Sequence, residues 1–375
     1  MNPNSICLVI GTLTAGGAER VMSWLANQLV QAGYQVTLVT LGDSGNDFFP
    51  LDPAVKRIGL GLQKRNNPLL KPFANLQRIL ALRGVIRDHQ VGRMVAFMPH
   101  ESVLAILATR ATDCRVVVSE RSAPWKRDPG WIWGLLRRYL YRFADGHAAQ
   151  TRASEEWLKT KTGARNIHNL PNPVRFPLPS APPVVAPVAF SSPGRHRVLA
   201  VGSRPHLKGF DLLARAFTRV ADKHPDWDLA IPGYTLDSAE NSEARHDFKA
   251  SLAREELTGR VHLPGRVGNL GDWFHSADIF VLSSRTEGFP NVLIEAMAHG
   301  CAVVAFDCDT GPRDIIRDGI DGLLVADGDV EALSVALDKV MGDRALRDRM
   351  GAAAQEVKNR FSEERVLTLW QEALA

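Results

Sequence analysis

The sequence has few cysteines and no long apolar run, and each of these absences narrows what the protein can be. Its four cysteines, among 375 residues, form no Cys-x-x-Cys pair and have no cluster of histidines nearby. We therefore expect neither disulfides nor a zinc site. No stretch approaches the roughly 18 consecutive apolar residues that a membrane span requires. The apolar run Ile6–Ile10 is too short for the core of a signal peptide and lacks a basic flank, so we expect a cytoplasmic protein.

Extensive disorder is also excluded, because 45% of the residues are hydrophobic and only 23% are charged. A length of 375 residues predicts two domains. The net charge of +4 conceals an asymmetry: residues 1–175 carry 23 Lys and Arg against 12 Asp and Glu, a net +11, and the other 200 residues carry 22 against 29, a net −7. The basic half either attracts an anionic partner, such as lipid headgroups, nucleic acid or a phosphorylated substrate, or consists of solvated helix faces.

Strand-like and helix-like segments alternate in two successive series. The first series runs from Ile6–Ile10 to Gly146–Gln150, and the second begins at Val198–Gly202 after a proline-rich stretch. This alternation predicts parallel sheets covered by helices. We therefore expect an α/β protein of two Rossmann-like domains, whose sheets face each other across a cleft that receives the ligand at the carboxyl ends of the strands. The expected boundaries are 1–170 for the first domain, 171–196 for a linker, 197–355 for the second domain and 356–375 for a C-terminal helix that packs back on the first.

The most informative segment, Ser283–Gly300, follows an apolar strand. A polar turn with Gly288 and Pro290 leads into a helix, and proline fits a first helical turn because its missing N–H is not needed there. Free backbone amides at such a helix start, together with the helix dipole, form an anion site suited to a diphosphate. Phosphates repel carboxylates, so Glu287 and Glu295 are better explained as acceptors for sugar and ribose hydroxyls. The amides in question belong to Asn291, Val292 and Leu293.

Two further segments place cations or glycines at a strand end. Arg204 and Lys208 follow the strand that opens the second series, and they would bring positive charge to the same crevice, Arg as a fork for phosphate oxygens and Lys as a point charge. The N-terminal loop Gly11–Gly17 meets neither the dinucleotide fingerprint nor the P-loop pattern. Its Gly16 and Gly17 either let the backbone approach a ligand closely or serve only a strand-to-helix turn.

As a set, these residues resemble the retaining glycosyltransferases of family 4, which have the GT-B fold. The similarity covers essentially the whole chain and is densest from 198 to 330. Its most specific part is the Glu-x7-Glu element that joins Glu287 to Glu295. The matching segments are Gly16–Arg20, Gly202–Gly209, Leu263–Val267, Glu287–Glu295, Gly311–Ile316 and Asp321–Val325.

The resemblance implies a catalytic group of Arg204, Lys208 and Glu287. The two cations would neutralise the donor diphosphate and stabilise the departing nucleotide. Glu287 would hold hydroxyls of the transferred hexose or N-acetylhexosamine, and Glu295 would hold the ribose. Arg266 and Val267 would border the base, while Gly16 and Gly17 would close over the phosphates from the other domain. The donor-binding residues implied in this way are Gly16, Gly17, Arg266, Val267, Gly288, Phe289, Asn291, Val292, Leu293 and Glu295.

The same resemblance implies that the enzyme retains anomeric configuration and needs no metal or other cofactor, since the cationic side chains and the helix terminus stand in for a metal. The donor would be a nucleotide sugar, with UDP favoured over GDP. One segment departs from the family pattern, because many relatives place a histidine where this chain reads Val118–Ser122. Arg121 cannot act as a base there but can bind an anionic group. The acceptor-side candidates are Glu120, Arg121 and His100, and the acceptor-side base is left unassigned.

The expected acceptor is a glycan or a polyprenyl-diphosphate-linked oligosaccharide, because the nearest-looking relatives assemble glycans on such carriers at the cytoplasmic face of the membrane. The aromatic and basic segment Trp131–Arg142 either rests on an anionic membrane surface or packs in the core with its arginines reaching solvent, and we favour the packed core. No nucleic-acid partner is expected, since recognised binding motifs are missing. Two other functions stay open: a non-catalytic sugar-nucleotide-binding partner subunit and a sugar-nucleotide epimerase, although no acid–base pair is placed for the latter.

Overall fold

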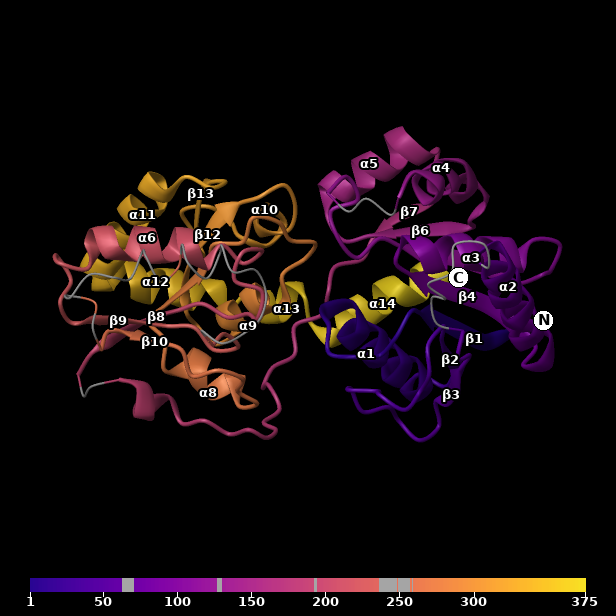
Figure 1. The fold of residues 1–375 in the computed structure, drawn as a ribbon, viewed down its shortest axis with the longest axis horizontal. Helices are drawn as coiled ribbons and strands as arrows, with labels where there is room; N and C mark the ends of the chain where they lie inside the picture. The colour runs from indigo at the N-terminus through magenta and orange to yellow at the C-terminus, as the bar shows by residue number, and fades with distance from the viewer. Residues whose placement is uncertain (63–70, 127–129, 192–193, 236–247, 249–256, 258) are drawn as a thin grey trace. The chain divides into compact units, whose positions relative to one another are not determined.

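The computed structural model describes residues 1–375 except 63–70, 127–129, 192–193, 236–247, 249–256 and 258 (Figure 1). The chain divides into two compact units. Unit 1 comprises Met1–Pro173 together with Glu364–Ala375, and unit 2 comprises Val174–Glu363. The linker expected at 171–196 includes residues 192–193, which lie outside the described residues.

Unit 1 is built on a seven-stranded sheet of order β3-β2-β1-β4-β5-β6-β7, with every neighbouring pair parallel. The side chains of β1 alternate between the two faces: Cys7 and Val9 enter one core, and Ile6, Leu8 and Ile10 enter the other. This follows from the two-residue period of a strand. The strands are β1 (Asn2–Ile10), β2 (Gln35–Thr40), β3 (Lys56–Gly59), β4 (Val91–Phe97), β5 (Arg115–Ser119), β6 (Gly146–Ala149) and β7 (Ile167–Asn169).

Helices cover both faces of the unit 1 sheet. Side chains of α2, α3 and α5 fill the core on one face, and α1 and α14 fill the core on the other. In α14, the last helix of the chain, Trp370 is fully buried and its ring lies 5.8 Å from that of Phe97 in β4. The helices are α1 (Gly17–Gln31), α2 (Lys71–Asp88), α3 (Pro99–Thr109), α4 (Trp131–Leu140), the 3-10 turn η2 (Tyr141–Phe143), α5 (Arg152–Thr162) and α14 (Glu363–Leu374).

Unit 2 repeats the arrangement with a six-stranded parallel sheet of order β10-β9-β8-β11-β12-β13. Side chains of α6, α11 and α12 pack on one face, and those of α8, α9 and α13 pack on the other. The strands are β8 (His196–Leu199), β9 (Trp227–Ala230), β10 (Val261–His262), β11 (Ile279–Leu282), β12 (Ala302–Asp307) and β13 (Leu323–Ala326). The helices are η3 (Pro187–Phe190), α6 (Phe210–Val220), α8 (Leu270–His275), α9 (Asn291–Ala298), α10 (Pro312–Ile315), α11 (Val330–Gly342), α12 (Arg344–Ala354) and α13 (Val357–Arg360).

The predicted α/β architecture of two successive parallel sheets is confirmed. In each sheet the strand order reverses once, between β1 and β4 in unit 1 and between β8 and β11 in unit 2. Open parallel sheets bind ligands outside the carboxyl ends of the strands at such a reversal. The fold thus directs attention in unit 2 to the turns that follow β8 and β11. Among the residues that the structure describes, no helix combines the length and the apolar character that crossing a membrane would take.

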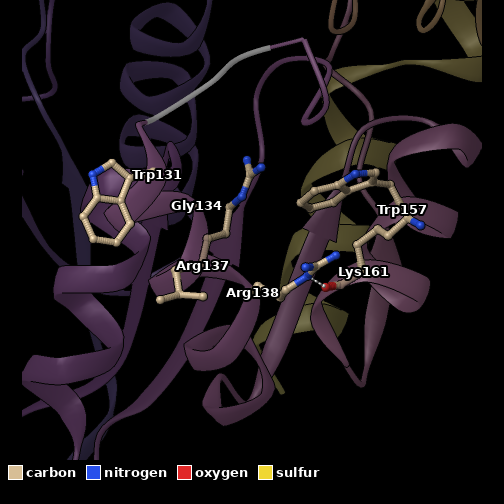
Figure 2. A pocket seen from close by; sticks show the side chains of 7 residues that line it. Trp131, Gly134, Arg137, Arg138, Trp157 and Lys161 are labelled. Carbon is tan, nitrogen blue, oxygen red and sulfur yellow. Dashed lines mark hydrogen bonds between the residues drawn. The ribbon is translucent and has the colours of Figure 1, made fainter.

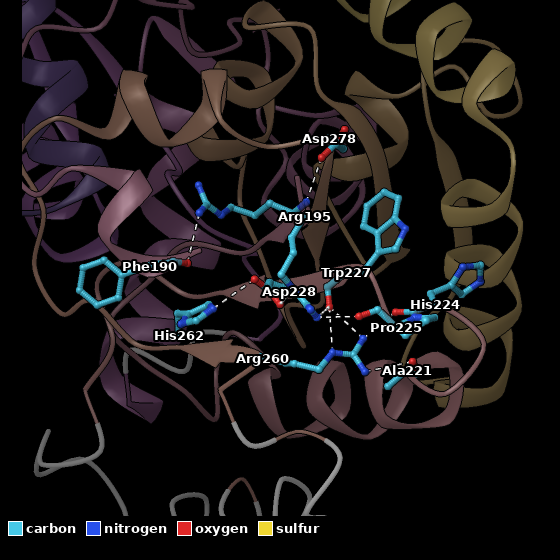
Figure 3. A network of polar contacts seen from close by, with 11 residues as sticks. Phe190, Arg195, Ala221, His224, Pro225, Trp227, Asp228, Arg260, His262 and Asp278 are labelled. Carbon is cyan, nitrogen blue, oxygen red and sulfur yellow. Dashed lines mark hydrogen bonds and ion pairs between the residues drawn. The ribbon is translucent and has the colours of Figure 1, made fainter. Parts of the chain in front are cut away.

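A buried polar network stabilises the opposite, amino-terminal edge of the unit 2 sheet (Figure 3). Arg195 contacts the buried carboxylate of Asp228 at 2.7 Å, and His262 lies 3.4 Å from the other carboxylate oxygen. Arg260 donates to the carbonyl oxygen of Trp227 at the start of β9. Each buried charge in this network has a hydrogen-bonding partner, as a stable interior requires. We therefore assign the network to folding and not to chemistry.

The proline-rich segment after Val174 packs along unit 2. The amide of Ala181 donates to the carbonyl oxygen of Gly268 at 2.9 Å, and the Gly268 amide donates back to Pro183 at 2.7 Å. The side-chain amide of Asn269 bonds both the N–H and the C=O of Val185, at 2.9 and 3.0 Å. These bonds attach the segment to the loop before α8.

Candidate active site

The turn after β8 and the turn after β11 pack directly on each other. Gly209 has a left-handed backbone, with φ of +61°, and a Cβ atom there would lie 2.0 Å from the carbonyl oxygen of Ser283. Only glycine permits so close an approach. The hydroxyl of Ser283 also donates to the carbonyl oxygen of Lys208 at 2.8 Å. The two turns therefore form one structural unit at the carboxyl ends of neighbouring strands.

This packing brings together two of the three predicted catalytic residues. Nζ of Lys208 lies 2.7 Å from Oε1 of Glu287, and the two side chains are 21% and 11% exposed. A charge-assisted hydrogen bond of this length at a half-buried position fixes both groups. Arg204 is exposed on the same turn as Lys208, whose amide donates to the Arg204 carbonyl oxygen at 2.9 Å. The site thus holds a cation–carboxylate pair beside a second cation.

Arg285 is a component of this site that the sequence analysis did not single out. Its guanidinium makes a two-pronged ion pair with Asp211 at the start of α6, with distances of 2.8 and 2.7 Å. It also donates to the carbonyl oxygen of His206 at 2.6 Å, and its amide donates to that of Leu207 at 3.0 Å. Arg285 thereby ties the segment before Glu287 to the turn that carries Lys208. Its place two residues before Glu287 is the only sequence signal for this role.

The turn that leads into α9 is supported from the loop before α10. The Thr310 hydroxyl donates to the carbonyl oxygen of Glu287. At Gly311, where φ is +97°, a Cβ atom would lie 2.7 Å from the Pro290 ring and 2.9 Å from the carbonyl oxygen of Gly288. Phe289 is buried with its ring 5.4 Å from that of Phe361, so its side chain anchors the turn in the core. The backbone of this turn is therefore preorganised.

The start of α9 differs from the expectation in two details. Pro290 is the N-cap residue and the helix begins at Asn291, whereas we expected Pro290 within the first turn. The amide of Leu293 donates to the carbonyl oxygen of Pro290 at 3.1 Å, so it is not free for an anion. The first turn tightens in this way because its amides lack earlier carbonyl partners.

The remaining predicted donor residues of unit 2 surround the same sheet edge. Val292 is half-buried, and Glu295, one turn into α9, is fully buried. Arg266 is exposed and Val267 half-buried in the segment after β10. The carbonyl oxygen of the preceding Gly265 accepts a 2.7 Å hydrogen bond from Gly233, which follows β9. These positions all follow strands of one sheet.

In unit 1 the predicted glycines begin α1. Gly16 is the N-cap residue and Gly17 the first residue of the helix. The carboxylate of Glu19 folds back so closely that a Cβ atom on Gly16 would lie 2.1 Å from its Oε2. A carboxylate in the first turn is stabilised by the helix dipole. The close approach at Gly16 is thus made by the flexible side chain of Glu19, a contact that the glycine pattern alone did not reveal.

Arg121, an acceptor-side candidate, is buried at the carboxyl end of β5. Its guanidinium lies 4.4 Å from the ring centre of Phe97 and donates to the side-chain oxygen of Asn172. Nε and Nη1 have no hydrogen-bond partner among the described residues. Burial lowers the pKa of Arg121 to about 9. A buried cation without a carboxylate partner is costly, so this position carries an unmet preference for negative charge.

The other two acceptor-side candidates are engaged inside unit 1. Oε1 of Glu120 accepts a 2.7 Å hydrogen bond from the Tyr141 hydroxyl and lies 3.5 Å from Arg137. Burial, together with the Glu120 charge, raises the pKa of Tyr141 well above its ordinary value. His100, near the start of α3, packs its ring edge against Trp133 at 4.1 Å between centres. Glu120 therefore connects the strand end to the helix that precedes β6.

The expectation that Trp131–Arg142 packs in the core with its arginines outside is confirmed only in part: Trp133, Leu136 and Leu140 pack against the core and Arg138 and Arg142 are exposed, but three other residues depart from it. Trp131 is 79% exposed, Tyr139 is 54% exposed, and Arg137 is buried. The guanidinium of Arg137 lies 4.4 Å from the ring centre of Trp157 in α5 and donates to the carbonyl oxygen of Pro124. Helix α4 therefore carries apolar side chains on both sides: Trp133 packs against the core, whereas Trp131 and Tyr139 face outward and Arg137 points inward.

Comparison with known sequences matches the chain in two consecutive segments. Residues 16–173 match the family described as glycosyl transferase 4-like domain, and residues 188–357 match the family of glycosyl transferases group 1. The chain is 26% identical, over 99% of its length and 98% of the relative, to a GalNAc-alpha-(1->4)-GalNAc-alpha-(1->3)-diNAcBac-PP-undecaprenol alpha-1,4-N-acetyl-D-galactosaminyltransferase of Campylobacter jejuni. It is 26% identical, over 98% of its length and 99% of the relative, to the amylovoran biosynthesis glycosyltransferase AmsD of Erwinia amylovora.

Solved structures show the same architecture. A sucrose-phosphate synthase from Thermosynechococcus elongatus matches with a TM-score of 0.80 at 20% identity, over 98% of this chain and 97% of that one. The Anabaena protein HepE, solved with UDP and glucose, matches with a TM-score of 0.74 at 17% identity, over 98% of both chains. At this level of identity the similarity is one of fold, and it confirms the predicted GT-B architecture.

Proposed function

Because the chain is a glycosyltransferase, with a glycosyl transferase 4-like domain followed by a group 1 domain, we propose that it transfers a hexose or N-acetylhexosamine from a nucleotide sugar to a lipid-linked glycan. In the proposed step the bond from the anomeric carbon to the donor diphosphate breaks, and a bond from that carbon to an acceptor hydroxyl oxygen forms with retained configuration. The products are the extended glycan, the nucleoside diphosphate and one proton.

The observation that carries this proposal is the ion pair of Lys208 and Glu287 at the carboxyl ends of β8 and β11. Lys208 has three N–H donors, and the bond to Glu287 uses one of them. The others remain for diphosphate oxygens, with Arg204 as the second cation. Charge that develops on the leaving diphosphate would be stabilised by these fixed cations without a metal. Glu287 in turn would accept hydroxyls of the sugar.

The donor-binding roles extend this proposal along α9 and β10. Glu295 would hold the ribose, Arg266 and Val267 would border the base, and Gly288 with the start of α9 would face the phosphates. UDP is the favoured nucleotide, supported by the structural similarity to HepE, which was solved with UDP and glucose. A lipid-linked acceptor is supported by the name of the Campylobacter relative, which specifies an undecaprenol-linked substrate.

On the acceptor side we propose that Arg121 attracts an anionic group of the acceptor, such as a carrier diphosphate. Two nitrogens of its buried guanidinium, Nε and Nη1, have no hydrogen-bond partner among the described residues. The atoms are covered, so an anion would need a local rearrangement around Phe97 and Asn172. Glu120 and His100 stay candidates for contacts with acceptor hydroxyls.

The test is ligand-dependent stabilisation followed by a transfer assay. The purified chain is heated with UDP, GDP, ADP and their common sugar conjugates, and a ligand at about 100 times its dissociation constant adds roughly 2.7 kcal/mol. We expect stabilisation by UDP that EDTA does not abolish. The responding donor is then incubated with polyprenyl-diphosphate-linked glycans, and the anomeric configuration of the product is read by NMR. A folded protein that no nucleotide stabilises would refute the proposed donor site, and donor consumption with release of an epimerised nucleotide sugar would refute transfer.

A further inference from the structure

Helix α4 presents an apolar face outward. Trp131, Ile132, Leu135 and Tyr139 are 79%, 50%, 49% and 54% exposed, and Phe143 in the following turn is 47% exposed. At 3.6 residues per turn, the four helical positions lie along one side of the helix. A surface helix of a globular protein normally shows the reverse pattern, with polar residues outward. This side of α4 therefore has the composition of a buried face without a covering element among the described residues.

Basic residues accompany the apolar ones on the same side. Arg138 and Arg142 are exposed, and the segment from Gly130 to Ala144 contains no acidic residue. The third arginine, Arg137, is buried against Trp157 and does not contribute charge to the surface. The exposed face thus combines large aromatic and aliphatic side chains with uncompensated positive charge.

A hollow between α4 and α5 adjoins this face (Figure 2). Its volume is about 460 Å³. Trp131 and Trp157 lie on opposite sides of it, and Arg138 reaches across to donate to the carbonyl oxygen of Lys161 at 3.4 Å. The residues that line it are Trp131, Gly134, Leu135, Arg137, Arg138, Trp157 and Lys161. The hollow thus has apolar walls and cationic residues at its rim, the same combination of side chains as the exposed side of α4.

We propose that this surface, the α4 face, lies on an anionic lipid bilayer; it is defined as Trp131, Ile132, Leu135, Arg138, Tyr139, Arg142 and Phe143. Tryptophan and tyrosine favour the boundary between headgroups and acyl chains, because their rings are apolar with a polar edge. An amphipathic helix binds there through its apolar area and through attraction of its basic residues to anionic lipids. The charge of the face is complementary to such headgroups, and it is unsuited to a basic or neutral partner.

The inference rests on the proposed function in one respect, since a lipid-linked acceptor would be reached at a membrane. Its own evidence is the exposure and charge of α4. The experiment therefore uses vesicles without donor or acceptor. The protein is sedimented at low salt with vesicles of phosphatidylcholine alone or mixed with phosphatidylglycerol, and the partition coefficient is measured for the wild type and for single variants.

We expect binding to the anionic vesicles only. Arg138→Gln and Arg142→Gln should each lower the partition coefficient about fivefold, and Trp131→Ala should lower it roughly tenfold through lost apolar burial. Two variants in unit 2 serve as matched controls. Arg344→Gln removes an exposed arginine of α12, and Val335→Ala removes an exposed apolar side chain of α11. Both should bind vesicles like the wild type, and circular dichroism should show all variants equally folded.

Three results would overturn the proposal: no sedimentation of the wild type with anionic vesicles, equal binding to neutral ones, or α4 variants that bind like the controls. If Trp131→Ala instead abolishes a concentration-dependent self-association seen without lipid, the face belongs to a second copy of the chain. Failure of sugar transfer to a detergent-solubilised acceptor, with vesicle binding intact, would count against the proposed function and leave the α4 face in place.

Discussion

The ammonium nitrogen of Lys208 donates a 2.7 Å hydrogen bond to Oε1 of Glu287, 79 positions further along the chain. The lysine charge is therefore balanced before any donor binds. A diphosphate that enters the site competes with the carboxylate of Glu287 for the ammonium group of Lys208. Sugar hydroxyls can replace the lysine as donors to Glu287, so donor binding would exchange one set of charge-assisted bonds for another.

Lys208→Met should lower kcat/KM roughly 10- to 150-fold, which corresponds to a loss of about 1.5–3 kcal/mol of transition-state stabilisation. The reason is that the substitution removes a charged hydrogen bond and leaves Glu287 without its cation. Glu287→Gln should leave UDP affinity equal or tighter, since it frees the lysine, while transfer falls. Calorimetric titration with UDP and initial-rate kinetics separate the two effects. The double variant should show non-additive losses, and strictly additive losses would mean that the two residues do not act together.

Arg285→Ala should impair the donor site although Arg285 does not contact the donor in the proposed function. Loss of the two-pronged bond leaves the buried carboxylate of Asp211 without its arginine partner. Because an unpaired buried polar group is costly, the free energy of unfolding should fall by about 1–3 kcal/mol. UDP affinity should fall as well, because the turn that carries Lys208 loses its attachment. Arg285→Lys should restore little, since lysine cannot make the two-pronged geometry. A variant with lowered stability and unchanged UDP affinity would limit Arg285 to folding.

Gly209→Ala should be far more damaging than Gly319→Ala. Both glycines have positive φ, +61° and +73°, so the backbone strain of alanine is similar at the two sites. Only at Gly209 would the new Cβ atom meet a neighbour, the Ser283 carbonyl oxygen at 2.0 Å. We expect Gly209→Ala to cost about 1–3 kcal/mol more, the usual range for overpacking. Urea unfolding measures the difference, and equal losses would show that the two turns separate easily.

The stability of the protein should depend on pH through Arg121. Burial lowers its pKa to about 9 in the folded state, well below the ordinary value that it has in the unfolded chain. Between these two values the unfolded chain binds more protons at this group, so its contribution to the free energy of unfolding rises with pH above about 9. Below pH 9 the cost of the buried charge is present in full. The curve for the wild type minus that for Arg121→Met should therefore rise between pH 8.5 and 10.5, and a flat difference would show that the guanidinium is better solvated than its burial indicates.

Much of the fold could be predicted from the sequence because both sheets are parallel and covered on two faces. Their strands read as short apolar runs between helices, and that signal is local. The turn from Glu287 to Asn291 was found for the same reason, since glycine, proline and a helix start are adjacent. The pairing of Lys208 with Glu287 depends on neighbouring strands and a glycine contact, and no local pattern shows it.

The orientation of α4 could not be read from its sequence. Its aromatic, apolar and basic residues allow either face to turn inward. In the structure the inward side carries Trp133 and Leu136 together with Arg137, whose guanidinium contacts Trp157 and the Pro124 carbonyl oxygen. Similarly, Gly16 was identified as a residue of close approach, but the group that approaches it in the structure is the carboxylate of Glu19. In the first case the partners are distant in the sequence, and in the second the partner is a side chain that can adopt several conformations. A local sequence pattern shows neither kind of contact.

The place of α14 has a consequence for biosynthesis. This helix supplies Val366, Trp370 and Leu374 to the core of unit 1, although every other element of that unit precedes Val174. Chains emerge from the ribosome N-terminus first, at about 5–20 residues per second. The place beside Phe97 that Trp370 fills therefore stays unoccupied until all of unit 2 has been translated. Unit 2 is continuous and can complete its own core before unit 1 does, so the order of folding should be the reverse of the order of synthesis.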